Sequence, residues 1–209
     1  MRSDLERKKH DYINELFAEE NATQSAIRNN IIALGEKQIQ IEAFEGKILS
    51  LLIDITGSKK ILEFGTMHGY STAWLADAVG RDGLIITIER DEVNAQIAFQ
   101  NLRNHSNIRI INKDAALIEN ELQKIAPFDL IFIDANKSSY KNYFDMADQL
   151  LKKGGLIIAD NCMFDYLLEE DKGRLAKIID EFNHYVASNK AYKSVILPTA
   201  GGFLCAFKL

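Results

Sequence analysis

The sequence has few of the features that would place it outside the ordinary globular classes. Only 2 of its 209 residues are proline and only 2 are cysteine, and Cys162 and Cys205 form no C-x-x-C pair. These scarcities exclude a proline-rich linker and a disulfide scaffold. Apolar runs such as residues 48–55 are too short to span a bilayer, and the charged N-terminus has no signal-peptide core. We therefore expect a cytoplasmic protein with no membrane partner.

Acidic residues outnumber basic ones, 30 to 25. The formal net charge is -5, so the sequence has no electrostatic signature of a nucleic-acid-binding protein. The hydrophobic share of 47% and the charged share of 26% are those of an ordinary folded domain. At this length one core suffices, and we predict a single domain over residues 1–209, with helices in 1–56 and an α/β core in 57–209.

Strand-like and helix-like patterns alternate along the predicted core. Near-continuous apolar runs, typical of buried parallel strands, lie at 60–64, 84–89, 108–113, 129–134 and 156–160. Helical patterns separate them at 72–79, 94–103, 118–125 and 140–151, with another at 174–187 and N-terminal ones at 4–34 and 43–55. This alternation predicts a doubly wound α/β sheet. The runs 192–197 and 203–208 are too close in sequence for a parallel crossover, so they predict a C-terminal antiparallel hairpin.

The most informative stretch is residues 61–71, where an apolar strand runs into an acid and then a glycine turn. Gly65 and Gly69 precede a helical run, so the backbone can approach a ligand and helix N–H groups can point at it. This pattern indicates a nucleotide-type cofactor. Glu63 would repel a pyrophosphate, which argues against a dinucleotide and for a cationic ligand. His68, inside the turn, is expected to be an exposed loop residue.

Acidic residues also end other predicted strands, where open α/β sheets bind their ligands. Glu89 comes 24 positions after Gly65, near the spacing at which an acid reaches a ribose, and we expect it to bind one. The alternative is an acid that caps the following helix. Asp114, after the third strand, either contacts an adenine or serves only as a turn residue.

Asp134, Asp160 and Asn161 offer three oxygen ligands from two strand ends. This donor set suits a hard cation, Mg²⁺, Mn²⁺ or Ca²⁺, and leaves coordination positions for substrate oxygens. Helix caps at the two aspartates are the alternative. Lys137 would project into the same cleft as a candidate base or as a positioner of an anionic oxygen, unless it is an ordinary surface lysine.

Three motifs carry a resemblance that spans almost the whole chain. They are LEFGT with GYS within residues 62–71, FDLIFIDANK at 128–137, and DN at 160–161. With them the sequence resembles the cation-dependent class I S-adenosylmethionine O-methyltransferases, the caffeoyl-CoA and catechol group, particularly its small bacterial members. The resemblance implies a Rossmann-like methyltransferase sheet. It also implies an enzyme that uses S-adenosylmethionine and Mg²⁺ (or Mn²⁺ or Ca²⁺) to methylate a hydroxyl of a small vicinal-dihydroxy aromatic.

The same resemblance assigns roles to individual residues. It implies an S-adenosylmethionine site lined by Ile41, Glu63, Gly65, Thr66, Ser71, Glu89, Ala115 and Asp134. Two further candidates come from the pattern itself: Gly69 in the glycine turn and Asp114 after the third strand. The cation that Glu63 faces would be the sulfonium. Asp134, Asp160 and Asn161 would hold the metal, and Lys137 with Asp134 would carry the catalysis. A homodimer is expected, with the N-terminal helices as candidate contacts.

The sequence departs from the family near the acceptor. The last hairpin turn reads Ala200-Gly201-Gly202 where the family commonly has Gly-Asp-Gly, so one acidic contact is missing. The loop after Asn161 lacks the family's tryptophan, and Phe164 or Tyr166 is expected to replace it. We predict that Phe164 and Lys137 contact the substrate. The alternative functions are a tRNA hydroxyuridine methyltransferase and a non-catalytic cofactor-binding module. An NAD-dependent dehydrogenase ranks last.

Overall fold

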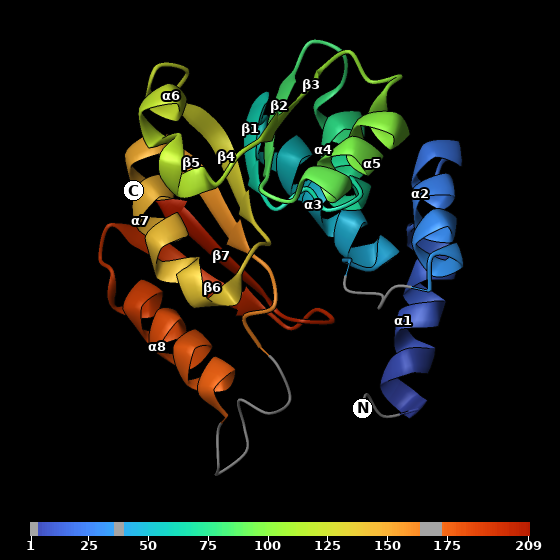
Figure 1. The fold of residues 1–209 in the computed structure, drawn as a ribbon. Helices are drawn as coiled ribbons and strands as arrows, with labels where there is room; N and C mark the ends of the chain where they lie inside the picture. Colours follow the sequence, from blue (N-terminus) through green and yellow to red (C-terminus); the bar gives the residue numbers. More distant parts are fainter. Residues whose placement is uncertain (1–3, 36–39, 164–172) are drawn as a thin grey trace.

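A computed structural model describes residues 4–35, 40–163 and 173–209 (Figure 1). Its centre is a seven-stranded sheet with the strand order β3-β2-β1-β4-β5-β7-β6. The strands are β1 (Lys60–Phe64), β2 (Leu84–Glu89), β3 (Ile108–Asn112), β4 (Phe128–Ile133), β5 (Leu151–Ala159), β6 (Tyr192–Leu197) and β7 (Phe203–Lys208). Strand β7 is antiparallel to β5 and β6, and the other pairs are parallel. The predicted sheet with its C-terminal hairpin is confirmed.

Helices cover both faces of this sheet (Figure 1). One face carries α2 (Ala22–Ala33), α3 (Ala43–Thr56), α4 (Tyr70–Val79) and α5 (Glu92–Leu102), and the other carries α6 (Glu119–Gln123), α7 (Tyr140–Leu150) and α8 (Arg174–Ser188). Successive side chains of β1 point to opposite faces of the sheet. Ile61 packs in the core beneath α2–α5, and Leu62 packs in the core beneath α6–α8. The fold is therefore doubly wound, as the alternating pattern predicted.

Helix α1 (Asp4–Phe17) lies apart from the sheet (Figure 1). No side chain of this fully described helix is buried. It is attached to the start of α3, where the Phe44 N–H donates to Asn14 Oδ1 at 2.8 Å and His10 Nδ1 lies 3.4 Å from a Glu42 carboxylate oxygen. No described helix combines the length and hydropathy needed to cross a membrane. The expected homodimer through the N-terminal helices stays a prediction.

Strand β5 begins earlier than the sequence predicts. The apolar run suggested a start at residue 156, whereas the strand includes Lys152, Lys153 and a glycine pair and begins at Leu151. Its register against β4 shifts between Phe128 and Leu130, which accommodates these residues within the ladder. Two lysines followed by two glycines have the composition of a turn, so local sequence preference gave the wrong start.

Candidate active site

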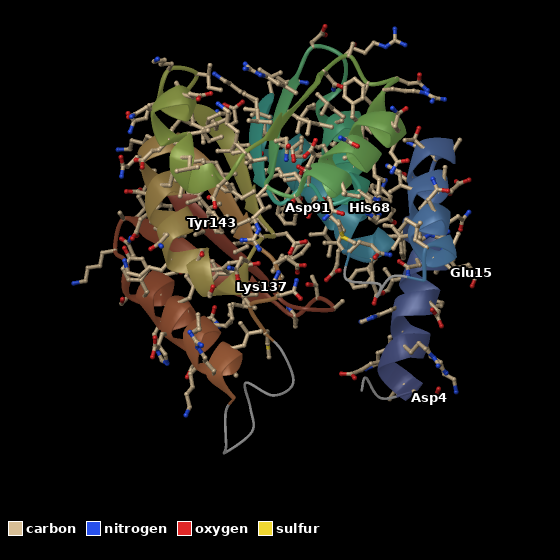
Figure 2. All side chains as sticks on the ribbon, in the orientation of Figure 1. Asp4, Glu15, His68, Asp91, Lys137 and Tyr143 are labelled. Carbon is tan, nitrogen blue, oxygen red and sulfur yellow. The ribbon has the colours of Figure 1, made fainter. Side chains whose placement is uncertain are left out.

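A cavity of ≈ 2120 Å³ opens at the carboxyl ends of β1, β2, β4 and β5. Across from these strand ends, α1 and the start of α3 form its other wall; Figure 2 labels Lys137 on the sheet side and Glu15 on α1. A site for one small ligand usually occupies roughly 300–1,000 Å³, so this cavity has room for a cofactor and an acceptor together. Most predicted site residues line it: Ile41, Gly65, Thr66, Ser71, Glu89, Asp114, Ala115, Asp134, Lys137, Asp160 and Asn161.

Glu89 is held rigidly at the end of β2. Its Oε1 accepts the N–H of Asp91 at 2.9 Å and its Oε2 accepts the N–H of Met67 at 2.8 Å. The side chain of Asn112 donates to the Glu89 carbonyl at 2.8 Å, which ties the ends of β2 and β3 together. A carboxylate has about four lone-pair positions, so each oxygen can accept one further bond from a ligand hydroxyl.

Asp114 lies at the same end of the cavity, where it acts as a cap, and its contact with an adenine stays a prediction. Its side chain accepts the N–H of Ala116 at 2.9 Å and so caps the short helix η1 (Ala115–Leu117). It also lines the cavity, beside Tyr143 of α7. The Tyr143 ring is stacked on Phe64 with 5.1 Å between ring centroids. Sequence reasoning missed Tyr143, because its helical context gave no sign that it reaches the strand ends.

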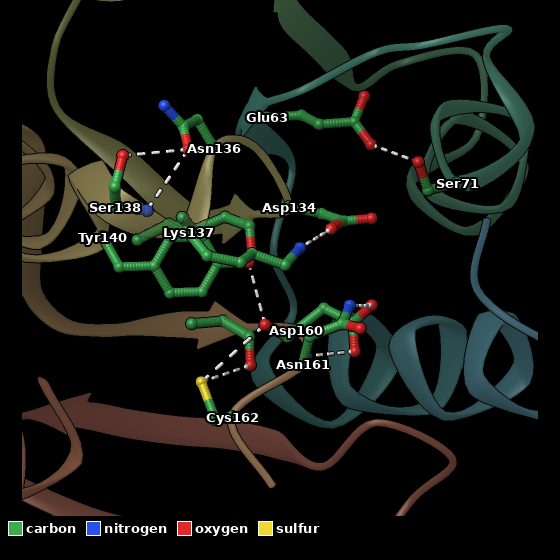
Figure 3. Close-up of polar contacts among 12 residues, drawn as sticks. Glu63, Ser71, Asp134, Asn136, Lys137, Ser138, Tyr140, Asp160, Asn161 and Cys162 are labelled. Carbon is green, nitrogen blue, oxygen red and sulfur yellow. Dashed lines mark hydrogen bonds and ion pairs between the residues drawn. The ribbon is translucent and has the colours of Figure 1, made fainter. Parts of the chain in front are cut away.

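Glu63 requires a correction, because its side chain does not line the cavity. It is fully buried, on the same face of β1 as Ile61, and points beneath α4. Its carboxylate accepts a hydrogen bond from the Ser71 hydroxyl at 2.6 Å (Figure 3). It also accepts hydroxyl hydrogen bonds from Thr72 at 2.5 Å and Thr87 at 2.6 Å. Of these donors, Ser71 lines the cavity, whereas Glu63 does not.

The glycine turn also differs from its prediction at two positions. Gly69 is the N-cap of α4 with φ 89, and a Cβ there would lie 2.6 Å from Leu102 Cδ1. It is therefore needed for packing against α5 and is not part of the cavity lining. His68, expected to be exposed, is only 1% exposed, and its carbonyl accepts the Asn101 side-chain N–H at 2.9 Å. The close approach of α5 buries both residues.

The predicted metal ligands lie together at the opposite end of the cavity (Figure 3). Lys137 Nζ donates to Asp134 Oδ1 at 2.7 Å. Asp160 is 3% exposed, and its Oδ1 accepts the Asn161 N–H at 2.6 Å while its Oδ2 accepts the Asn161 side-chain amide. Asn161 has φ 59, a left-handed conformation that asparagine tolerates better than most residues. The predicted proximity of Asp134, Lys137, Asp160 and Asn161 is therefore confirmed.

Burial and mutual repulsion act on the carboxylates of this cluster. Burial raises the pKa of Asp160 well above its usual range, and the nearby carboxylates of Asp134 and Glu45 raise it further. Burial likewise raises the pKa of Glu45, which is 2% exposed in the first turn of α3. Lys137 opposes the rise at Asp160. Buried carboxylates that repel one another are stabilised when a cation is placed between them.

Comparison with known proteins identifies the family. A family model described as O-methyltransferase matches residues 14–209. The chain belongs to this O-methyltransferase family. A catechol O-methyltransferase from Niastella koreensis is 36% identical over 197 residues, which cover 91% of this chain and 89% of that protein. A caffeoyl-CoA O-methyltransferase from Populus kitakamiensis is 32% identical over 159 residues, covering 69% of this chain and 68% of that protein. The predicted family and enzyme class are confirmed.

Solved structures of O-methyltransferases have the same architecture. TomG from Streptomyces achromogenes, in complex with SAM, matches with a TM-score of 0.88 at 26% identity over 99% of both chains. An O-methyltransferase from Bacillus cereus, in complex with SAH, matches with a TM-score of 0.85 at 28% identity over 97% of both chains. The methyltransferase fold thus extends over the N-terminal helices as well as the sheet.

Tyr140 is a residue of the methyltransferase site that sequence reasoning missed. Its hydroxyl donates to the Asp160 carbonyl at 2.8 Å, and Lys137 Nζ lies 5.2 Å from the centre of its ring (Figure 3). The ring therefore stabilises the lysine by a cation–π contact, and the hydroxyl fixes the end of β5. Its position three residues after Lys137, at the start of a helix, was the available signal.

The metal prediction rests on two carboxylates and one amide. Among the described residues, no group of three or more His, Cys, Asp or Glu side chains is arranged to hold a metal ion. The third predicted ligand, Asn161, is an amide, and its oxygen suits the hard cations that prefer carboxylates and carbonyls. The predicted substrate contact Phe164 lies outside the described residues.

The buried Glu63 gives the methyltransferase a predictable dependence of stability on pH. Burial raises the pKa of this carboxyl from 4.5 to about 7, although the hydroxyls of Ser71, Thr72 and Thr87 oppose the rise. Between these values the folded protein keeps a proton that the unfolded chain has released, so its stability falls as pH rises, and above about 7 the loss is complete.

Glu63→Gln is expected to remove this part of the pH dependence. Between pH 5 and pH 8, the free energy of unfolding of the wild type should fall by about 2.5 kcal/mol more than that of the variant. Urea denaturation at the two pH values measures both changes. The exposed Glu181→Gln serves as the matched control. Parallel pH profiles for wild type and Glu63→Gln would contradict the protonation of Glu63.

Proposed function

We propose that this protein transfers the methyl group of S-adenosylmethionine to a hydroxyl of a small vicinal-dihydroxy aromatic, with a divalent cation held by Asp134, Asp160 and Asn161. The observation that carries the proposal is one cavity with two differently equipped ends. Glu89 is fixed for ribose hydroxyls at one end, and carboxylates with a lysine gather at the other. The similarity to the catechol O-methyltransferase of Niastella koreensis and to the SAM complex of TomG supports the same assignment.

The residues of the first end suit S-adenosylmethionine, which when bound supplies an electrophilic methyl group on its sulfonium sulfur. Glu89 accepts the ribose hydroxyls through the lone pairs that its two backbone N–H bonds leave free. Gly65, with φ 100, lines the cavity and lets the chain turn past the backbone of Asp134, which a Cβ would meet at 2.1 Å. Asp114 and Tyr143 are available for the adenine.

The residues of the second end suit Mg²⁺ and an acceptor diol. Asp134, Asp160 and Asn161 would hold a divalent cation, which when bound would lower the pKa of the acceptor hydroxyl. Asp160 and Asn161 are fixed by their own hydrogen bonds, so their oxygens need little rearrangement to bind. Lys137, anchored on Asp134 and on the Tyr140 ring, would orient the acceptor oxygen. Its amine would take up the acceptor proton after the ammonium has released one of its own protons to solvent, a loss that the positive charge of a neighbouring cation would favour.

A panel of acceptors tests the function directly. Catechol incubated with the protein, S-adenosylmethionine and Mg²⁺ should give a product heavier by one methyl group in mass spectrometry. Phenol, which lacks the second oxygen, should give at most a trace. Labelled methyl transfer to bulk tRNA instead of catechol would favour the tRNA hydroxyuridine methyltransferase. Cofactor binding by calorimetry without turnover of any acceptor would favour the non-catalytic binding module.

The charge of the cavity wall predicts which diols are preferred. On α1 and the start of α3, acids outnumber bases among the residues that line the cavity: Asp4, Glu6, Asp11, Glu15, Glu42 and Glu45 against Arg7 and His10. This wall favours a neutral or cationic acceptor and disfavours an anionic one, including a coenzyme A thioester with its phosphates.

Two catechols that differ only in side-chain charge measure this preference. At low salt, a catechol with an alkylamine side chain is expected to have a kcat/KM about tenfold higher than one with a carboxylate side chain of equal length. The ratio should shrink as salt is added, because surface charges are screened over about 10 Å at 0.1 M ionic strength. A preference for the carboxylate, or a ratio that does not respond to salt, would rule out selection by the wall.

A further inference from the structure

Glu45 connects two segments on opposite sides of the cavity. Its Oε2 accepts the N–H of Glu42 at 2.8 Å, which closes a capping box at the start of α3. Its Oε1 accepts the N–H of Gly201, in the turn between β6 and β7, over a longer 3.4 Å. Since Glu45 is 2% exposed, water competes little for these bonds. One buried carboxylate thus joins the start of α3, next to the cavity-lining Ile41, to the hairpin turn.

The same turn packs directly against Asn161. The carbonyl of Gly201 accepts the N–H of Met163 at 2.8 Å, and the carbonyl of Gly202 accepts the N–H of Cys162 at 3.0 Å. A Cβ placed on Gly201 would lie 3.2 Å from Cα, Cγ and Oδ1 of Asn161. The position of the turn therefore sets the space available to the Asn161 side chain.

We propose that Glu45 is a positioning residue that holds this turn against Asn161 and thereby fixes the amide oxygen for the cation. This role rests on the proposed function, in which Asn161 is a metal ligand. The turn of this chain, Ala200-Gly201-Gly202, has no acidic side chain of its own. Glu45 supplies a buried carboxylate to it from α3. Residues behind a metal ligand commonly change metal affinity by about 10- to 100-fold when they are altered.

Binding of Mn²⁺ to the full-length, chelator-treated protein tests this role without measuring turnover. Electron paramagnetic resonance of free Mn²⁺ gives the dissociation constant. Glu45→Ala and Gly201→Ala are each expected to raise it about tenfold. Gly201→Ala is the sharper variant, because it moves Asn161 while every carboxylate stays in place. Its affinity for S-adenosylhomocysteine, measured by calorimetry, should stay within about threefold of wild type, since the turn lies at the acceptor end.

Gly173→Ala is the matched control, because its φ is -60 and a Cβ there would meet nothing within 4 Å among the described residues. Mn²⁺ affinity should not change in this variant, and thermal unfolding verifies that each variant is folded. Wild-type Mn²⁺ affinity in Gly201→Ala would overturn the positioning role while leaving the proposed function intact. The role also fails if only Glu45→Ala loses affinity, since Glu45 would then act through its charge alone. A wild type that binds no Mn²⁺ would contradict the proposed metal site and this role together.

Discussion

Asp160→Ala is expected to lower kcat/KM for methyl transfer about 10³-fold, a loss of roughly 4 kcal/mol of transition-state stabilisation. Asp160 contributes a buried carboxylate to the acidic end of the cavity, and its two oxygens orient Asn161. The substitution therefore removes one proposed cation ligand and releases another. Steady-state kinetics with catechol at saturating S-adenosylmethionine measures the effect.

Cofactor affinity separates this loss from general damage to the site. S-adenosylhomocysteine should bind Asp160→Ala within about threefold of wild type, because Glu89, at the end of β2, lies at the other end of the cavity. Asp54→Ala, at an exposed position on α3, is the matched control and should retain full activity. A variant that keeps more than a tenth of the wild-type kcat/KM would show that Asp160 does not hold a catalytic cation.

Gly65→Ala is expected to lower the free energy of unfolding by roughly 2–6 kcal/mol. The residue has φ +100, and a Cβ would lie 2.1 Å from the backbone oxygen of Asp134. The neighbouring atom is backbone and cannot rotate away, so overpacking of about 1–3 kcal/mol adds to about 1–3 kcal/mol of backbone strain. Separation of the β1 and β4 ends should also weaken cofactor binding, since Thr66 and Asp134 line the cavity.

Gly57→Ala isolates the packing part of this prediction. Gly57, the C-cap of α3, also has a positive φ of +62, yet within the described part of the chain a Cβ there would have no neighbour closer than 4 Å. We expect it to cost only about 1 kcal/mol, the price of the left-handed conformation. Urea denaturation of both variants at one pH measures the difference. Equal losses in the two proteins would mean that the contact with Asp134 is relieved by backbone movement.

Features that depend on local pattern could be predicted from the sequence. The apolar runs that became β1 and β2 were bounded correctly, and the short link before the last strand required an antiparallel hairpin. Polar residues at strand ends were brought together because parallel strands share one carboxyl edge. That rule placed Glu89, Asp134 and Asp160 in the cavity before any contact between them was known.

Contacts between distant segments could not be predicted in the same way. Glu63 was expected to face the ligand, but its hydroxyl partners come from α4 and β2, and the period of the strand places it with Ile61 under the helices. His68 was expected to be exposed because the packing of α5 on the turn has no local signature. Glu45 contacts the hairpin turn through Gly201, which is 156 positions away in the sequence, so no local pattern could predict the contact.

The central claim is metal-dependent methylation of a vicinal diol, and one assay tests it most directly. The protein is incubated with S-adenosylmethionine and catechol in excess chelator, and then with Mg²⁺ added back beyond the chelator. Methylated product is counted by mass spectrometry. We predict that the chelator lowers turnover at least about 100-fold, in line with the several kcal/mol that a catalytic cation supplies, and that Mg²⁺ restores it. Equal turnover with and without the chelator would contradict the account.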